Sequence, residues 1–199
     1  MPNEDYLVKL KKLCGGKNIL LILDEVQTGT GRTGKFFAYL HYSIKPDIVT
    51  LAKGLANGVP IGVMIAGKGI DFDKGDHAST FGGNNLSCAA ANATIDFIIK
   101  NKLMSNAIKQ GNYFIKKLNQ LKNKYDIIKE VRGKGLMIGI EFNFETKPLV
   151  QKMLEKGVLA NATANTVLRL VPPLNISYDD LGKAMEVLKK SLKELQDNE

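Results

Sequence analysis

Ile19-Leu-Leu-Ile-Leu-Asp24-Glu25-Val26-Gln27 is the stretch that decides the fold expected for this chain. It is leucine-rich and β-branched, long enough for a buried strand and too short for most helices. A second run of the same kind follows, Asp47-Ile-Val-Thr-Leu-Ala-Lys53-Gly54. Each run delivers a charged residue at its carboxyl end, where parallel α/β sheets place their ligands. An acid and a lysine at adjacent strand ends can hold a flat, charged ligand, so Asp24 and Lys53 are the first functional candidates.

The composition is that of an ordinary globular protein, with 199 residues, 44% hydrophobic and 24% charged. No apolar stretch approaches the roughly 18 residues that a membrane helix needs, and the N-terminus does not have the pattern of a secretory signal. Cys14 and Cys88 are far apart and unpatterned, as expected for buried thiols in a reducing compartment. We therefore expect a cytoplasmic protein with no membrane association and no metal site.

The formal charge of +8 comes largely from lysines that we assign to two helices. Solvated helix faces explain them better than a nucleic-acid groove, because no aromatic residues interleave with them as stacking platforms. We expect no nucleic-acid partner. A basic nucleic-acid-binding module remains an alternative, and its signature would be salt-dependent binding to random DNA.

Hydrophobic patterning predicts two parts that meet near residue 105. Residues 1–105 form an α/β unit and residues 106–199 a smaller α+β unit. In the first unit we expect a helix capped by Asn3 and stopped by Gly15-Gly16, three strands, and a close-packed helix of small residues. After residue 101 we expect a long amphipathic helix whose apolar residues run from Ile108 to Leu121. It is followed by a glycine-punctuated strand at 131–142, a short helix at about 148–156, a strand at 166–171 and a final helix from about 178.

Gly29 to Gly34 spells G-x-G-x-x-G, and Gly29 to Lys35 spells most of a P-loop, but the loop fits neither kind of nucleotide site. A P-loop has a hydroxyl residue after its lysine, and here that residue is Phe36. In a dinucleotide site the next strand ends in an acid, and here it ends in Lys53. We interpret the loop as one whose backbone must bend sharply.

Three groups of residues together resemble a known family: Leu23-Asp-Glu-Val-Gln-Thr-Gly-Thr-Gly-Arg-Thr-Gly34, Leu51-Ala-Lys53-Gly54 and Ser79-Thr80-Phe-Gly-Gly-Asn84. The chain is similar to the C-terminal half of class III aminotransferases of fold type I, which use pyridoxal 5′-phosphate (PLP). Phe36–Tyr39, Asn57–Gly62 and Val167–Leu174 resemble the acetylornithine aminotransferase group most. The resemblance implies an α/β fold: part of the PLP-binding large domain, with a mostly parallel sheet, at 1–105, and a small α+β C-terminal domain at 106–199.

The resemblance also implies roles for the residues after the first strand. PLP is an electron sink only while its pyridine nitrogen stays protonated, and the acid that holds this proton matches Asp24. Val26 would pack against the ring, and Gln27 would hydrogen-bond its phenolic oxygen. The alternatives are an aspartate that caps a loop and a glutamine that satisfies loop backbone.

Lys53 matches the Schiff-base lysine of the family, and a surface lysine after a strand is the alternative. A lysine whose pKa is lowered by desolvation and nearby positive charge is a nucleophile, and once displaced it can move a proton. The residues that matter for catalysis are therefore Lys53 and Asp24.

Thr80 matches a residue that the family donates across a dimer to the PLP phosphate of the partner, and Ser79 is a second donor. A hydroxyl that caps the helix beginning near Asn84 is the alternative role of Thr80. Ala78 and Asn85 stand where the family has glycine and proline. Arg169 matches the arginine that grips the substrate α-carboxylate, with a structural salt bridge as its alternative.

Class III enzymes are about twice as long as this chain, and their upstream site elements have no counterpart here. Without the missing strands, we expect residues 20–23 or a neighbouring strand to present an unpaired apolar edge. Either a homodimer or a complementing N-terminal half is the expected partner, with an amino acid and a 2-oxo acid as substrates.

The expected reaction moves an amino group between N-acetylornithine, or a similar ω-amine, and 2-oxoglutarate, with little or no turnover by the isolated chain. An ornithine or 4-aminobutyrate aminotransferase and a non-catalytic partner of a longer homologue remain the alternatives.

Overall fold

The chain divides into two compact units, Met1–Met104 and Ser105–Glu199, in a computed structural model that describes residues 2–196. Each unit has its own sheet and its own core, and we describe them separately. No helix of the described residues is long and apolar enough to cross a bilayer.

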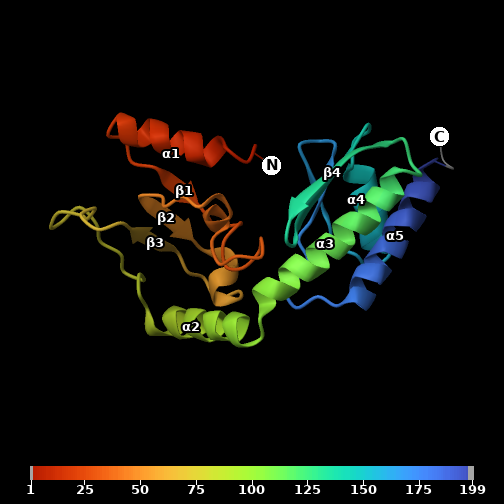
Figure 1. Ribbon diagram of the computed structural model, residues 1–199. Coiled ribbons are helices and arrows are strands. Elements are labelled where there is room, and N and C mark those ends of the chain that lie inside the picture. The colour runs from red at the N-terminus through yellow and green to blue at the C-terminus, as the bar shows by residue number, and fades with distance from the viewer. Residues whose placement is uncertain (1, 197–199) are drawn as a thin grey trace. The chain divides into compact units, whose positions relative to one another are not determined.

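The first unit is built on a sheet of three strands in the order β1-β2-β3 (Figure 1). β1 (Ile22–Asp24) and β2 (Ile48–Leu51) are parallel, whereas β3 (Val63–Ala66) is antiparallel to β2. The antiparallel pair arises because the chain turns back after β2 through a short connection, and a parallel return would need a longer crossover. Asn57 and Gly58 make this reversal, with φ of 49° and 107°.

Four helical segments accompany this sheet: α1 (Tyr6–Gly16), the 3-10 helices η1 (Ala38–Tyr42) and η2 (Lys53–Ala56), and α2 (Asn85–Lys100). Figure 1 shows the strands between α1 and α2. The expected cap Asn3 is wrong, because Asp5 holds the N-cap position and Asn3 contributes only its carbonyl oxygen, 3.0 Å from the Tyr6 nitrogen. The core is small and includes Leu51, Leu55, Ala56 and Ala91.

The outer edge of β1 is apolar and open in the described part of the chain. Leu20 and Ile22 are 52% and 57% exposed, and β1 ends the strand order. Met64 and Ile65 on β3, the other end of the sheet, are 47% and 46% exposed. This is the edge expected of a sheet that has fewer strands than the full domain.

The second unit has an antiparallel sheet in the order β4-β5-β7-β6. Its strands are β4 (Ile128–Lys134), β5 (Met137–Phe142), β6 (Asn161–Thr163) and β7 (Val167–Leu170). The single strand expected at 131–142 is a hairpin, because Gly135, with φ of 55°, reverses the chain. β6 was not expected.

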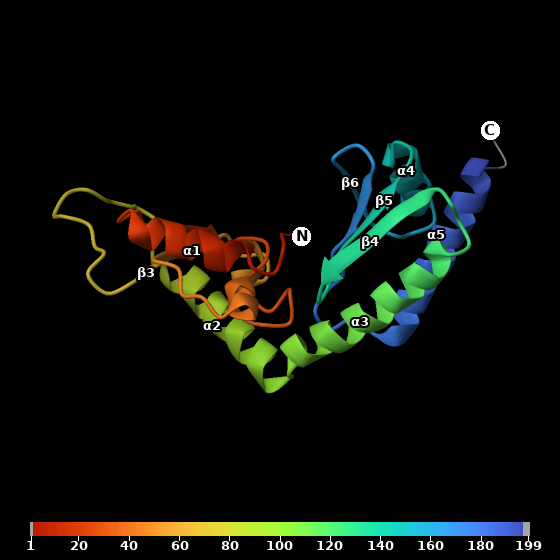
Figure 2. The ribbon, with the colours of Figure 1, turned by 45° about the horizontal axis from the view of Figure 1, so that its top comes forward.

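Helices α3 (Leu103–Lys122), α4 (Lys147–Glu155) and α5 (Tyr178–Gln196) complete this unit. Figure 2 shows α3 and α5 together along the sheet. Alternate residues of β5 and β7 are buried against the helices, since strand side chains alternate between faces. The fully buried residues of this core include Ile138, Ile140 and Phe142 on β5, Leu168 on β7, and Leu188 and Leu192 on α5.

Candidate active site

Asp24 and Lys53 lie at the carboxyl ends of two adjacent parallel strands of the first sheet. Asp24 is the last residue of β1 and pairs in register with Thr50 of β2. Lys53 comes after the end of β2 and begins η2. Both side chains are exposed. The carboxyl ends of parallel strands are where α/β folds bind ligands, so the pair has the position that the sequence predicts.

Lys53 has a strained backbone, with φ of 48° in the left-handed region. A residue with a Cβ in such a conformation costs about 1–3 kcal/mol, and such residues cluster at functional sites. Here the strain places a lysine where glycine would be the ordinary choice. Lys102, an exposed lysine with φ of 52°, has the same conformation, so the assignment of Lys53 depends on its place after β2 rather than on its backbone.

Asp24 uses one of its two carboxylate oxygens locally. Its Oδ1 accepts a hydrogen bond from the Val26 backbone nitrogen at 2.9 Å, which is an Asx turn. The loop-capping alternative is therefore realised by one oxygen. Within residues 2–196 no hydrogen bond to Oδ2 is formed, so this oxygen is available to a ligand. Val26 and Gln27 are half-buried in the turn that follows.

Glu25, to which sequence reasoning gave no role, is the buried carboxylate of this region, with 3% of its surface exposed. Its oxygens accept hydrogen bonds from the Thr28 hydroxyl and from the backbone nitrogens of Ala38 and Tyr39. The sequence signal for Glu25 was a second charged residue directly after the strand-end acid. Because neighbouring residues of a strand point to opposite faces, Glu25 has to face away from Asp24.

Ser79 and Thr80 lie on a long loop of the first unit that extends away from β3 (Figures 1 and 2). All residues from 71 to 86 are exposed, and Phe81 is 81% exposed. The Ser79 hydroxyl accepts from the Gly82 nitrogen at 2.9 Å. Asn84, not Thr80, caps α2 by accepting from the Ser87 nitrogen at 2.9 Å. The capping role that was the alternative for Thr80 is thus filled by another residue.

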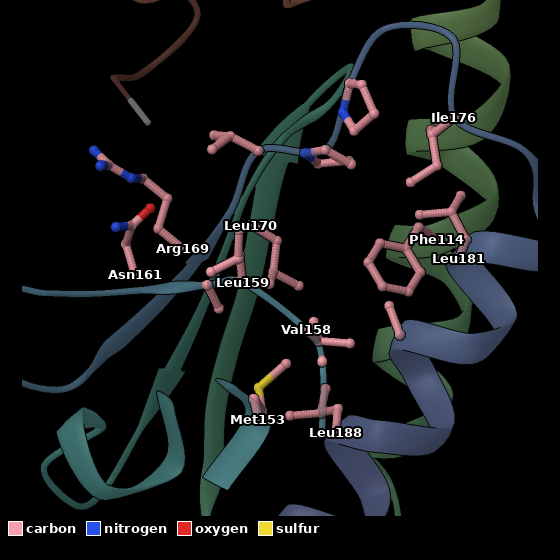
Figure 3. A pocket seen from close by; sticks show the side chains of 16 residues that line it. Phe114, Met153, Val158, Leu159, Asn161, Arg169, Leu170, Ile176, Leu181 and Leu188 are labelled. Carbon is pink, nitrogen blue, oxygen red and sulfur yellow. The ribbon is translucent and has the colours of Figure 1, made fainter. Parts of the chain in front are cut away.

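Arg169 lies in the second unit, on β7, opposite Gly139 of β5 and Asn161 of β6. It lines one side of a cavity of about 620 Å³ with largely apolar walls. Figure 3 shows Arg169 beside Asn161 at one end of this cavity and Phe114 and Leu188 at the other. In Figure 3 the guanidinium of Arg169 points away from the apolar residues Phe114 and Leu188, and a half-buried guanidinium in this position suits a carboxylate.

Arg132 on β4 pairs with Gly139 of β5, which in turn pairs with Arg169. Its Nη1 lies 2.7 Å from Glu130 and 2.6 Å from Glu141. The hydrogen bond to Glu141, reinforced by Glu130, raises the pKa of Arg132. Arg132 is therefore committed to two carboxylates.

Metal-ligand clusters are absent from the described range 2–196, where no group of three or more His, Cys, Asp or Glu residues converges. The two histidines have local contacts: the His41 ring lies 3.1 Å from Thr33, and His77 stacks on Phe72.

The chain matches the model of the family described as Aminotransferase class-III over residues 1–192. It belongs to this family. The class-III chain is 47% identical to the acetylornithine aminotransferase of Methanocaldococcus jannaschii over 198 residues, which are 98% of this chain and 50% of that protein. It spans about half the length of the curated relatives it matches, in keeping with a C-terminal half.

Solved structures agree with this assignment. The acetylornithine aminotransferase of Elizabethkingia anophelis superposes with a TM-score of 0.88 at 37% identity, covering 98% of this chain and 50% of that one. An ornithine aminotransferase of Toxoplasma gondii, described with partial occupancy of PLP at its active site, has a TM-score of 0.92 at 35% identity, covering 100% of this chain and 48% of that one. The fold is therefore that of PLP fold type I aminotransferases.

PLP is the cofactor of this family, and the residues of the first unit fit it. A carboxylate oxygen without a partner among the described residues and an exposed, strained lysine are carried to one sheet edge. The protonated ring nitrogen of PLP needs a carboxylate, and the aldehyde of PLP needs an amine. The exposed hydroxyls of Ser79 and Thr80 suit a phosphate.

Proposed function

We propose that this chain is the C-terminal half of an aminotransferase that moves an amino group between N-acetylornithine, or a similar ω-amine, and 2-oxoglutarate. The observation that carries the proposal is the position of Asp24 at the end of β1 and of Lys53 just after the end of the adjacent parallel strand β2. The relatives support the substrate, since curated proteins that are 46–47% identical to this chain are acetylornithine aminotransferases. Ornithine aminotransferases are close structural neighbours, so ornithine is the competing amine.

Asp24 and Lys53 would hold PLP, which supplies an electron-withdrawing ring when bound. The Asp24 Oδ2 would keep the proton on the pyridine nitrogen, since a neighbouring carboxylate favours the charged form. The Lys53 amine would bind the cofactor covalently. Once released by substrate, the same amine would remove the proton from the substrate Cα.

The remaining residues would bind and orient. Val26 would pack against the ring and Gln27 would hydrogen-bond the phenolic oxygen. Arg169 would grip the substrate carboxylate with its planar guanidinium, a geometry that suits two parallel hydrogen bonds. Arg132 would not do so, because two glutamates already occupy it.

We propose a homodimer or a complementing N-terminal half as the partner. The exposed loop from 71 to 86 supports a role of Ser79 and Thr80 in the phosphate site of a second subunit. The open apolar edge of β1 and the half-length match support a complementing polypeptide. We expect little or no turnover by the isolated chain, and a cytoplasmic location in keeping with two free cysteines.

The test is covalent trapping. The chain is incubated with PLP up to millimolar concentration and reduced with borohydride, and labelled peptides are mapped by mass spectrometry. We expect Lys53 to be labelled in preference to the exposed Lys116, and Lys53→Ala to lose the visible absorbance band. A band that survives this substitution would refute the lysine assignment. Steady-state assays of the completed enzyme with N-acetylornithine, ornithine and 4-aminobutyrate then decide the amine.

A further inference from the structure

Glu25 is the most fully hydrogen-bonded carboxylate near the strand ends, and the proposed reaction does not use it. Its Oε2 lies 2.8 Å from the Thr28 hydroxyl and 2.9 Å from the Ala38 nitrogen, and its Oε1 lies 2.8 Å from the Tyr39 nitrogen. All three partners donate, as a buried carboxylate requires. The side chain therefore ties the start of η1 to the end of β1.

The backbone of Glu25 is held as firmly as its side chain. Its nitrogen donates to the Thr50 carbonyl oxygen at 2.9 Å, which extends the β1–β2 pairing by one residue. Its carbonyl oxygen accepts from the Gly29 nitrogen at 2.9 Å. A Cβ at position 29 would lie 2.8 Å from that oxygen and 2.6 Å from Leu51 Cδ2, so only glycine fits. Glu25 is thus fixed by five hydrogen bonds, three to its side chain and two to its backbone.

Asp24 and Val26, the two neighbours of Glu25 in the chain, make the Asx turn that orients the Asp24 carboxylate. Because consecutive residues share peptide planes, a fixed residue 25 restricts the backbone of residues 24 and 26. Burial and the nearby Glu25 charge raise the pKa of Tyr39, which agrees with a carboxylate directed at this segment.

We propose that Glu25 is a positioning residue of the cofactor site, which acts through Asp24 by fixing the strand end that presents this carboxylate to the ring nitrogen. The proposal rests on the proposed function, since it assigns to Asp24 the contact with the cofactor. Pre-organised groups of this kind need support from their neighbours, because small misplacements weaken binding and catalysis strongly.

The experiment measures PLP binding to the full chain by absorbance titration and borohydride trapping at Lys53. Glu25→Gln keeps the shape but replaces one acceptor oxygen by an N–H donor that faces a backbone donor. We expect its dissociation constant for PLP to rise about tenfold, with a shift of the visible band. Glu4→Gln, the same change at an exposed position of the first unit, should leave both unchanged.

A double-mutant comparison separates positioning from general stability. If Glu25 acts through Asp24, then Glu25→Gln weakens binding by less than about threefold in a chain that already carries Asp24→Asn. Thr28→Val, which removes one of the three hydrogen bonds, provides a second, milder variant in case Glu25→Gln does not fold. It should give a smaller change in the same direction.

The outcomes are distinct. Wild-type chain that is not trapped at Lys53 overturns the proposed function and, with it, this inference. Wild-type chain that is trapped, together with unchanged affinity and spectrum in both Glu25→Gln and Thr28→Val, overturns the inference alone. Equal effects of Glu25→Gln with and without Asp24→Asn also overturn it, because Glu25 would then act independently of Asp24.

Discussion

Asp24 lies directly opposite Thr50 in the parallel pairing of β1 and β2, so Lys53 follows soon after the partner of Asp24 on the neighbouring strand. This register brings an acid and an amine to one edge of the sheet, although they are far apart in the sequence. The strained backbone of Lys53, with φ of 48°, is part of the same arrangement.

The strain at Lys53 predicts that stability and function separate at this position. We expect Lys53→Gly to be about 1 kcal/mol more stable than Lys53→Ala, because a left-handed backbone penalises any Cβ more than glycine loses in chain entropy. Both variants should lose trapping of PLP. Urea denaturation of the two proteins measures the difference, with Lys45→Ala at an exposed position as the control. Equal stability of the two variants would contradict the strain.

Asp47 links α1 to the start of β2 and makes the first unit sensitive to acid. Its carboxylate lies 2.7 Å from Lys11 Nζ and 2.8 Å from the Leu21 nitrogen, and these hydrogen bonds lower its pKa. A lowered pKa in the folded state stabilises the fold above the ordinary aspartate pKa of about 3.9, and this contribution is lost as the pH falls through the folded-state value.

We therefore expect Asp47→Asn to lower the melting temperature of the chain at pH 7, with the difference from wild type shrinking below about pH 4. Melting curves between pH 2 and 8 provide the measurement. Asp71→Asn, at an exposed position, is the control and should show no such pH dependence. A difference that grows toward low pH would mean that the sign is wrong.

Two helical glycines of the second unit should respond to alanine in opposite ways. A Cβ on Gly111 of α3 would lie 2.0 Å from the Gly135 carbonyl oxygen, whereas a Cβ on Gly182 of α5 would have no neighbour within 4 Å. We expect Gly111→Ala to destabilise by about 1–3 kcal/mol and Gly182→Ala to stabilise by about 0.5–1 kcal/mol. Chemical denaturation checks both, and a stable Gly111→Ala would show that α3 can move away from the hairpin.

The core of the second unit offers a matched pair of leucines. Leu168 on β7 is fully buried, with 0% exposed, and Leu159 is 84% exposed. We expect Leu168→Ala to lower the free energy of unfolding by about 2–5 kcal/mol and Leu159→Ala to change it by no more than about 0.5 kcal/mol. The measurement is guanidinium denaturation. A large effect at Leu159 would point to a contact of that residue in the assembled protein.

Much of the fold follows from local patterns. The strands that end at Asp24 and Leu51 and the helices at α3 and α5 all have apolar periodicities that act over short distances. The antiparallel direction of β3, the hairpin at Gly135 and the short β6 were not predictable in this way, since they depend on chain reversals and on long-range pairing. The predicted cap of α1 was also wrong. Asn3 is a suitable capping residue by type, but the helix begins later and Asp5 holds the N-cap position.

The sequence by itself determined the family, the strand-end acid and the strand-end lysine, because residue type and spacing along one strand are local properties. Only the tertiary structure decided that β1 and β2 are neighbours with Asp24 opposite Thr50, that Arg132 is occupied by two glutamates, and that Asn84 caps α2. It also decided that Glu25 is buried among donors from residues 28–39. The physical reason is that burial and hydrogen-bond partners arise from residues distant in the chain, which no local pattern encodes.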